Sequence, residues 1–112
     1  MASLRDIILS SGESCQIYYG AKRYSSIVSL RGDAGNLHNF LFVSGYGAST
    51  IRNNVTFVSK NNIKLYTDKT SPTTLYVTNT GGSRQKMSIL NLIGEGTIEY
   101  ISSIPSTAEE MT

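Results

Sequence analysis

The sequence has no tryptophan, two prolines, and only one cysteine and one histidine among its 112 residues. A lone cysteine excludes a disulfide within the chain and any metal site built from several cysteines. A single histidine leaves a serine or cysteine nucleophile only one candidate base, His38. Cys15 opens an alternating strand pattern, which is more typical of a small core residue than of a nucleophile. We therefore expect no catalytic residues, no metal and no cofactor.

Charged side chains are also scarce, at 16% of the chain, and the net charge is only +2. The densest basic pair is Lys22-Arg23, whereas nucleic-acid binding needs several cations on one patch. The carboxylates fall mostly in turn-like segments, so the two facing acids of a glycoside hydrolase are a remote alternative. The longest apolar run, Phe40-Leu41-Phe42-Val43, is far shorter than the roughly 20 residues of a membrane-spanning helix. We expect neither nucleic-acid binding nor membrane insertion.

Small polar residues take the place of the missing charges. Ser, Thr and Asn make up 35 residues, and they favour strands and turns over helix interiors. Short strand-like runs alternate with turns that contain Gly, Asn, Asp or Pro. The runs predict nine strands, over residues 6–9, 15–19, 26–30, 39–43, 54–59, 63–67, 74–78, 86–92 and 97–101. This pattern predicts an all-β domain over residues 1–104, an antiparallel, jelly-roll-like β-sandwich of about eight to nine strands.

Residues 105–112 are expected to form a short acidic tail, in which 106–111 is the best helix candidate and frays. Two β-hairpins are expected within the sandwich. One joins residues 63–67 to 74–78, and the other joins 90–93 to 97–101 around Gly94-Glu95-Gly96, whose glycines can adopt positive φ.

The segment from Phe40 to Val43 is apolar on both faces of its predicted strand. One interpretation is a central strand that lies between the core and covering loops. The other is that its outer face packs against a second copy of the chain, because a small sandwich leaves one face of each sheet exposed. The sequence pattern alone leaves both interpretations open.

The seven tyrosines suggest a binding role, since a tyrosine ring can stack on a sugar while its hydroxyl stays hydrated. Tyrosine is also favoured in strands, which is the simpler interpretation for Tyr66, Tyr76 and Tyr100. Loops are the expected binding elements, over residues 31–38, 44–52 and 68–73. For ligand contact the sequence favours two aromatic residues and three hydrogen-bond acceptors: Tyr24, Tyr46, Asp33, Asn36 and Asp68. Tyr46 is either a ligand contact or a packed residue that fixes the corner between two strands, and Arg52 is assigned the structural role at that corner.

Residues 39–100 resemble a known group of viral proteins. The resemblance rests on Phe-Leu-Phe-Val-Ser-Gly-Tyr-Gly, the following Arg52, and the strands Val-Thr-Phe-Val, Ile-Lys-Leu-Tyr, Thr-Leu-Tyr-Val and Ile-Glu-Tyr-Ile. These segments are similar to those of the distal head domains of bacteriophage tail fibres and tailspikes. It implies a small trimeric β-sandwich that recognises a host-surface glycan or receptor. It also implies a place in the tail appendage of the virion after synthesis in the host cytoplasm.

The resulting hypothesis is a non-catalytic receptor- or glycan-binding head domain that acts as a homotrimer. Such a module gains avidity from its three copies. The first alternative is a purely structural domain for trimerisation or capping of a fibre. The second is a carbohydrate-binding module of a cellular glycan-active protein, which would be monomeric.

Overall fold

The structure is a computed structural model, and it describes residues 2–20, 22–32, 38–46 and 50–112. Ten strands are present in this part of the chain: β1 (Ser3–Leu9), β2 (Ser14–Tyr18), β3 (Tyr24–Gly32), β4 (His38–Gly45), β5 (Val55–Phe57), β6 (Ile63–Asp68), β7 (Thr74–Asn79), β8 (Gln85–Ile93), β9 (Thr97–Ile101) and β10 (Ala108–Met111). All nine strands predicted from the sequence are among them.

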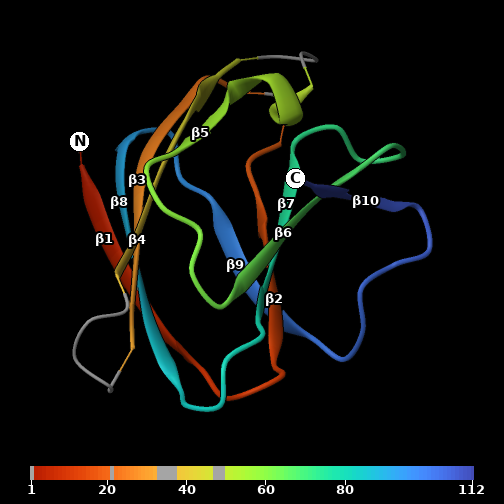
Figure 1. Cartoon of the computed structure of the whole chain (residues 1–112). Coiled ribbons are helices and arrows are strands. Elements are labelled where there is room, and N and C mark those ends of the chain that lie inside the picture. Colours follow the sequence, from red (N-terminus) through yellow and green to blue (C-terminus); the bar gives the residue numbers. More distant parts are fainter. Residues whose placement is uncertain (1, 21, 33–37, 47–49) are drawn as a thin grey trace.

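The strands form two antiparallel sheets of five strands each, which pack face to face (Figure 1). Sheet A has the order β1-β8-β3-β4-β5, and sheet B has the order β10-β6-β7-β2-β9. Strands β1 and β8 pair in sheet A, and in chain order they lie outside β2 and β7, which pair in sheet B. Strands β3, β4 and β5 are consecutive in the chain and are neighbours in sheet A. The expectation of an all-β antiparallel sandwich is confirmed.

The core lies between the sheets and follows from the alternation within each strand. In β3, Val28 and Leu30 point inward and are fully buried, while the intervening Ser29 is half-buried on the outer face. Leu41 of β4 and Ile17 of β2 are fully buried in the same cluster. Each such side chain contributes about 1.5–3 kcal/mol relative to an exposed position.

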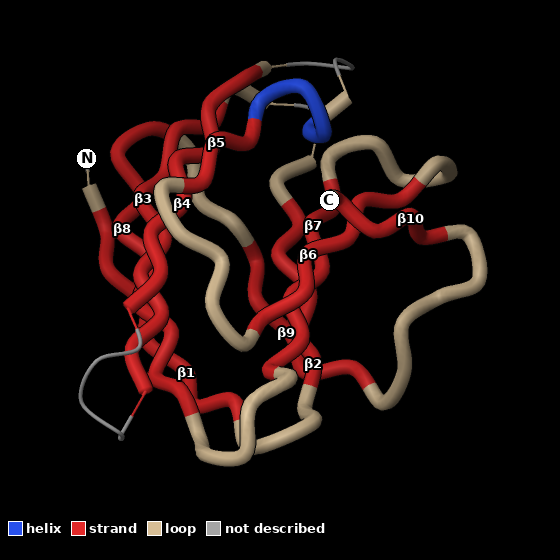
Figure 2. Tube along the Cα trace, viewed as in Figure 1, coloured by secondary structure: helices blue, strands red, loops and turns tan. Residues whose placement is uncertain are grey.

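The short 3-10 helix η1 (Ile51–Asn54) lies between β4 and β5, at one end of the sandwich (Figure 2). Its Ile51 is fully buried, and the amide of Ile51 donates a hydrogen bond of 2.7 Å to the carbonyl of Pro72 in the β6–β7 loop. The helix therefore links sheet A to a loop of sheet B. Within the described residues, no helix has the length and apolar character needed to cross a membrane.

The hairpin predicted over residues 63–67 and 74–78 is confirmed by the pairing of β6 with β7. The second predicted hairpin is wrong, because β8 and β9 belong to different sheets and β9 pairs with β2. The loop between β8 and β9 crosses from sheet A to sheet B. Gly94 adopts φ +70° there, and a Cβ on it would lie 2.4 Å from the carbonyl oxygen of Arg23. The glycine thus serves the crossing and not a tight hairpin turn.

The C-terminal segment corrects a further expectation. Ala108–Met111 forms β10, which pairs with β6 at the edge of sheet B, so the segment is part of the sandwich and not a fraying helix. Met111 is buried against the core, and Arg52 donates a hydrogen bond of 2.8 Å to the carbonyl of Glu110. Arg52 thereby anchors the last strand, a structural role different from the one predicted for it at the corner around Tyr46.

Candidate functional site

The three predicted ligand contacts that the structure describes, Tyr24, Tyr46 and Asp68, do not form one site. Tyr24 is only 2% exposed, so its predicted surface position is wrong. Its ring stacks on Tyr19 with the ring centroids 4.5 Å apart, and its hydroxyl accepts a hydrogen bond from the Asn54 amide. Tyr24 faces inward because it starts the buried face of β3, although the preceding Lys22 and Arg23 are exposed.

Asp68 is 5% exposed, and both of its carboxylate oxygens accept hydrogen bonds within the protein. Oδ1 accepts from the amide and the hydroxyl of Thr70, and Oδ2 accepts from the hydroxyl of Tyr76. Burial by itself raises the pKa of the Asp68 carboxyl. The hydrogen bonds from Tyr76, Thr70 and Thr107 outweigh this effect and lower the pKa to about 2. This arrangement stabilises the β6–β7 turn and leaves little capacity for a ligand.

Tyr46 follows the end of β4 and is 67% exposed, so it keeps the surface position that the sequence predicted. Asp33 and Asn36 lie outside the described residues. Tyr24 pairs with Gly45, which places Tyr24 near the Tyr46 end of sheet A, whereas Asp68 belongs to sheet B. The structure therefore does not bring Asp68 together with the two tyrosines in one sheet.

The outer face of sheet A carries an exposed apolar row. The register aligns Leu4 of β1 with Leu90 of β8, Leu90 with Ile27 of β3, and Ile27 with Phe42 of β4. Directly opposed residues on neighbouring strands share a face and contact one another. We call Leu4, Leu90, Ile27 and Phe42 the apolar row. Leu4 is 64% exposed and Phe42 is 44% exposed.

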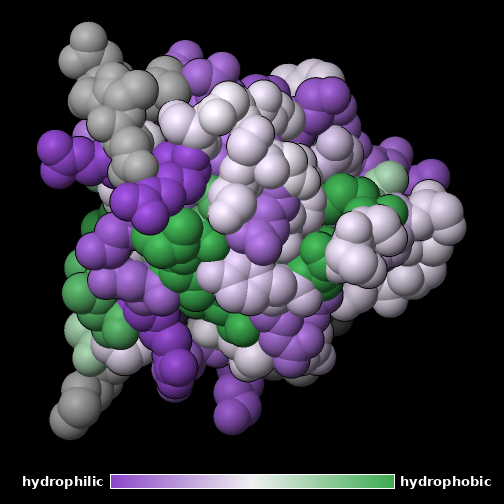
Figure 3. Space-filling model, turned by 90° about the horizontal axis from the view of Figure 1, so that it is seen from below, coloured by the Kyte–Doolittle hydropathy of each residue, from purple (hydrophilic) through white to green (hydrophobic). Residues whose placement is uncertain are grey.

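Other apolar side chains border this row. Leu92 projects from the outer face of the same sheet next to Leu90 and is exposed, and Val58 is exposed just after β5. Ile8 is exposed on the same face, but Asp6 and Ser88 separate it from the row. Figure 3 views the molecule from below and shows hydrophobic residues among polar ones on the side where sheet A lies. An exposed apolar row of this kind is typical of a protein interaction surface.

The outer face of sheet B has a different character. The corresponding row across its five strands contains Glu110, Tyr66, Tyr76, Gln16 and Glu99. These residues are charged, amide or phenolic. Tyr76 is 3% exposed and its hydroxyl bonds to Asp68, whereas the other four offer hydrogen-bonding groups to water. The two sheets therefore differ in what they present to solvent, because the row on sheet A is aliphatic and aromatic and this one is polar.

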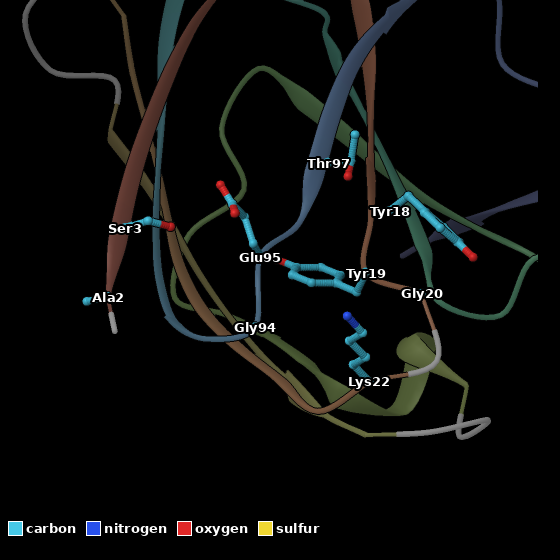
Figure 4. A pocket seen from close by; sticks show the side chains of 9 residues that line it. All are labelled: Ala2, Ser3, Tyr18, Tyr19, Gly20, Lys22, Gly94, Glu95 and Thr97. Atoms are coloured by element: carbon cyan, nitrogen blue, oxygen red, sulfur yellow. The ribbon is translucent and has the colours of Figure 1, made fainter.

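A pocket of about 590 Å³ opens where the edge strands β1 and β9 approach each other (Figure 4). It is lined by residues from the start of β1, the end of β2 and the β8–β9 loop: Ala2, Ser3, Tyr18, Tyr19, Gly20, Lys22, Gly94, Glu95 and Thr97. On this side of the sandwich, Arg5 of β1 forms an ion pair of 2.7 Å with Glu95 of the β8–β9 loop. Tyr100 of β9 also joins the two sheets, because its hydroxyl donates a hydrogen bond of 2.7 Å to the carbonyl of Ile8 in β1.

A buried phenol lies at this pocket. Tyr19 is 6% exposed, and its hydroxyl is fully buried beside the Ser26 hydroxyl. Burial raises the pKa of Tyr19 to about 12, against a smaller lowering by the nearby Ser26 hydroxyl. The phenol is therefore neutral at physiological pH and can donate a hydrogen bond.

The two residues considered for nucleophilic chemistry lie far from each other in the fold. Cys15 is fully buried in sheet B, where burial and then Glu13 raise the pKa of its thiol to about 12. His38 is exposed on the outer face of sheet A, where its ring lies against Phe40 and its Nε2 is 3.1 Å from the Ser29 hydroxyl. Cys15 is a core residue, in agreement with the interpretation of its strand pattern.

The sequence alone did not predict the pocket. Tyr18-Tyr19-Gly20 beside Lys22 was the available signal, because it places two phenols and an ammonium at the end of one strand. The carboxylate of the pocket, Glu95, lies in a loop that was predicted from the sequence to form a hairpin. Comparison of the chain with family models, with curated proteins and with solved structures gave no match.

Proposed function

We propose that this chain is a non-catalytic receptor- or glycan-binding head domain that acts as a homotrimer at the tip of a phage tail fibre or tailspike. The observation that carries the assembly part of the proposal is the apolar row on sheet A. Leu4 and Phe42 at its two ends are among the more exposed apolar side chains of the domain. Association would remove the whole row from water at about 25 cal/mol for each Å² of apolar surface.

The binding part of the proposal is supported by the pocket between β1 and β9. It combines phenols, hydroxyls, one ammonium and one carboxylate, which suit a hydroxyl-rich ligand. Its edge position leaves the outer face of sheet A free for subunit contact. Three weak sites on one trimer would act together on a cell surface that displays many copies of a glycan.

A purely structural role in trimerisation or capping is the second candidate, and the apolar row favours it equally. The two roles differ in whether the assembled protein binds a host surface. Loss of host adsorption after substitution of pocket residues, with assembly intact, supports the binding role. Unchanged adsorption supports the structural role.

The test compares wild-type protein with Phe42→Lys on a glycan array and on host cells. Phe42→Lys places a charge in the apolar row, and Tyr66→Lys is the matched control because Tyr66 is a half-buried aromatic residue on the outer face of sheet B. We expect Phe42→Lys to lose surface binding at least tenfold through lost avidity, while Tyr66→Lys retains it. Wild-type protein that binds no glycan and no host cell contradicts the proposal.

A further inference from the structure

The outer face of sheet A changes from apolar to basic along its strands. Beyond the apolar row, the next row on the same face aligns Asp6 of β1 with Ser88 of β8. The row after that aligns Lys86 of β8 with Arg31 of β3, and Arg31 with His38 of β4. We call Lys86, Arg31 and His38 the basic row, and all three are exposed. At about 3.3 Å for each residue, the basic row lies roughly 13 Å along the strands from the apolar row.

The charges of the basic row are only partly balanced within one copy of the chain. Lys86 and Arg31 are directly opposed on neighbouring strands, and like charges in such a pair repel each other. The ammonium of Lys86 lies 3.5 Å from a carboxylate oxygen of Asp6, which compensates one of the two cations. Within the described part of the chain, Arg31 forms no ion pair. One copy therefore presents an uncompensated guanidinium group on this face, among the described residues.

Cyclic symmetry relates the basic row to the apolar row in an assembly. All three copies of a cyclic trimer point the same way along the three-fold axis, so identical residues lie at the same height and at the same distance from it. The two rows project from one face of one sheet. If the strands run along the axis, the contact that brings three apolar rows together at one level also places three basic rows around the axis at a second level.

We propose that the strands of sheet A run along the three-fold axis of the trimer, and that the three basic rows form a site on that axis for a small, doubly charged inorganic oxyanion such as sulfate. The Arg31 guanidinium groups supply the uncompensated charge and paired N–H donors, which match the geometry of an oxyanion. One copy contributes a single such group, so the site is incomplete without its two partners. This inference rests on the trimer of the proposed function, and it adds the orientation of the subunits and a ligand that stabilises them.

The test is the association constant of the wild-type trimer, measured by sedimentation equilibrium in sodium sulfate and in sodium chloride of equal ionic strength. Equal ionic strength makes general screening the same in both salts. Sulfate at about 5 mM should raise the association constant roughly tenfold over chloride, as one anion with a Kd of about 0.5 mM for the trimer would do. A trimer with the same association constant in both salts overturns the inference.

Two variants locate the effect of sulfate. Arg31→Gln removes the uncompensated cation, so it should assemble more tightly than the wild type in chloride and should lose the response to sulfate. Lys64→Gln is the matched control, because it removes a cation from the outer face of sheet B, and it should respond to sulfate like the wild type. A full response to sulfate in Arg31→Gln contradicts the assigned site.

The same measurements separate this inference from the proposed function. If the wild type sediments as a monomer in both salts, the trimer of the proposed function is wrong and this inference fails with it. If the wild type is a trimer whose stability is the same in sulfate and chloride, the inference alone fails and the trimer stands.

Discussion

The hydroxyl of Tyr76 in β7 donates a hydrogen bond to Oδ2 of Asp68 at the end of β6, across the hairpin that joins these strands. Thr70, in the connecting loop, donates to the other oxygen of the same carboxylate. Burial, and then the bond to Asp68, raise the pKa of Tyr76 to about 12. The sequence suggested Asp68 as a sugar acceptor, and the structure shows it fixing a turn.

Asp68→Asn should therefore destabilise the fold. The amide replaces one acceptor oxygen with a donor, which leaves a buried donor unpaired at a cost of roughly 1–3 kcal/mol. Asp6→Asn is the control, because Asp6 is exposed and its ion pair of 3.5 Å with Lys86 lies at the surface. Urea denaturation measures both free energies of unfolding. A variant with unchanged stability and lost glycan binding would show instead that Asp68 is a ligand contact.

The low pKa of the same carboxylate predicts that the free energy of unfolding depends on pH. The folded pKa of Asp68 is about 2, below its ordinary value of 3.8, so the folded state favours the ionised form. The stability from this group is fully present above pH 4 and is lost as the pH falls from about 4 to 2. Asp68→Asn should therefore lose less stability than the wild type between pH 5 and pH 2, as thermal unfolding across that range would show. Parallel pH curves for the two proteins contradict this assignment.

The close backbone contact of Gly94 in the β8–β9 loop predicts that alanine variants of two glycines with positive φ differ in stability. Gly12 has φ +79°, and a Cβ added to it would meet no other atom within 4 Å, whereas a Cβ at Gly94 would lie 2.4 Å from the carbonyl oxygen of Arg23. Gly12→Ala should cost about 1–2 kcal/mol for the left-handed conformation alone. Gly94→Ala should cost roughly 3 kcal/mol or more, because the backbone must also move. Equal melting temperatures of the two variants would contradict the close approach at Gly94.

The strands could be predicted from the sequence because the alternation of apolar and polar residues is a property of neighbouring residues in the chain. Val28 and Leu30 of β3 are buried and the intervening Ser29 is half-buried on the outer face, which shows it directly. The strand β10 was missed because an edge strand buries little, and only Met111 of its four residues is buried. The partner of β9 was also hidden, since the Gly94-Glu95-Gly96 loop is compatible with a hairpin and with a crossing between sheets.

The sites were harder to predict than the strands because they depend on contacts between distant segments. Arg5 and Glu95 are 90 residues apart in the chain, and their ion pair exists only once β1 and the β8–β9 loop come together. Tyr24 was misplaced because its exposed neighbours suggested a surface, while the period of β3 directs its side chain inward. The apolar face of the segment from Phe40 to Val43 was visible, but its continuation through Ile27 and Leu90 to Leu4 required the register of sheet A.

The molar mass in solution, measured by light scattering at micromolar concentration, tests the central claim most directly. We expect wild-type protein and Tyr66→Lys at three times the mass of the chain. Phe42→Lys should be a folded monomer, because Phe42 lies on the exposed row, whereas Leu41→Lys should unfold, because Leu41 is fully buried in the core. A wild-type protein that is a stable, folded monomer under these conditions contradicts the account.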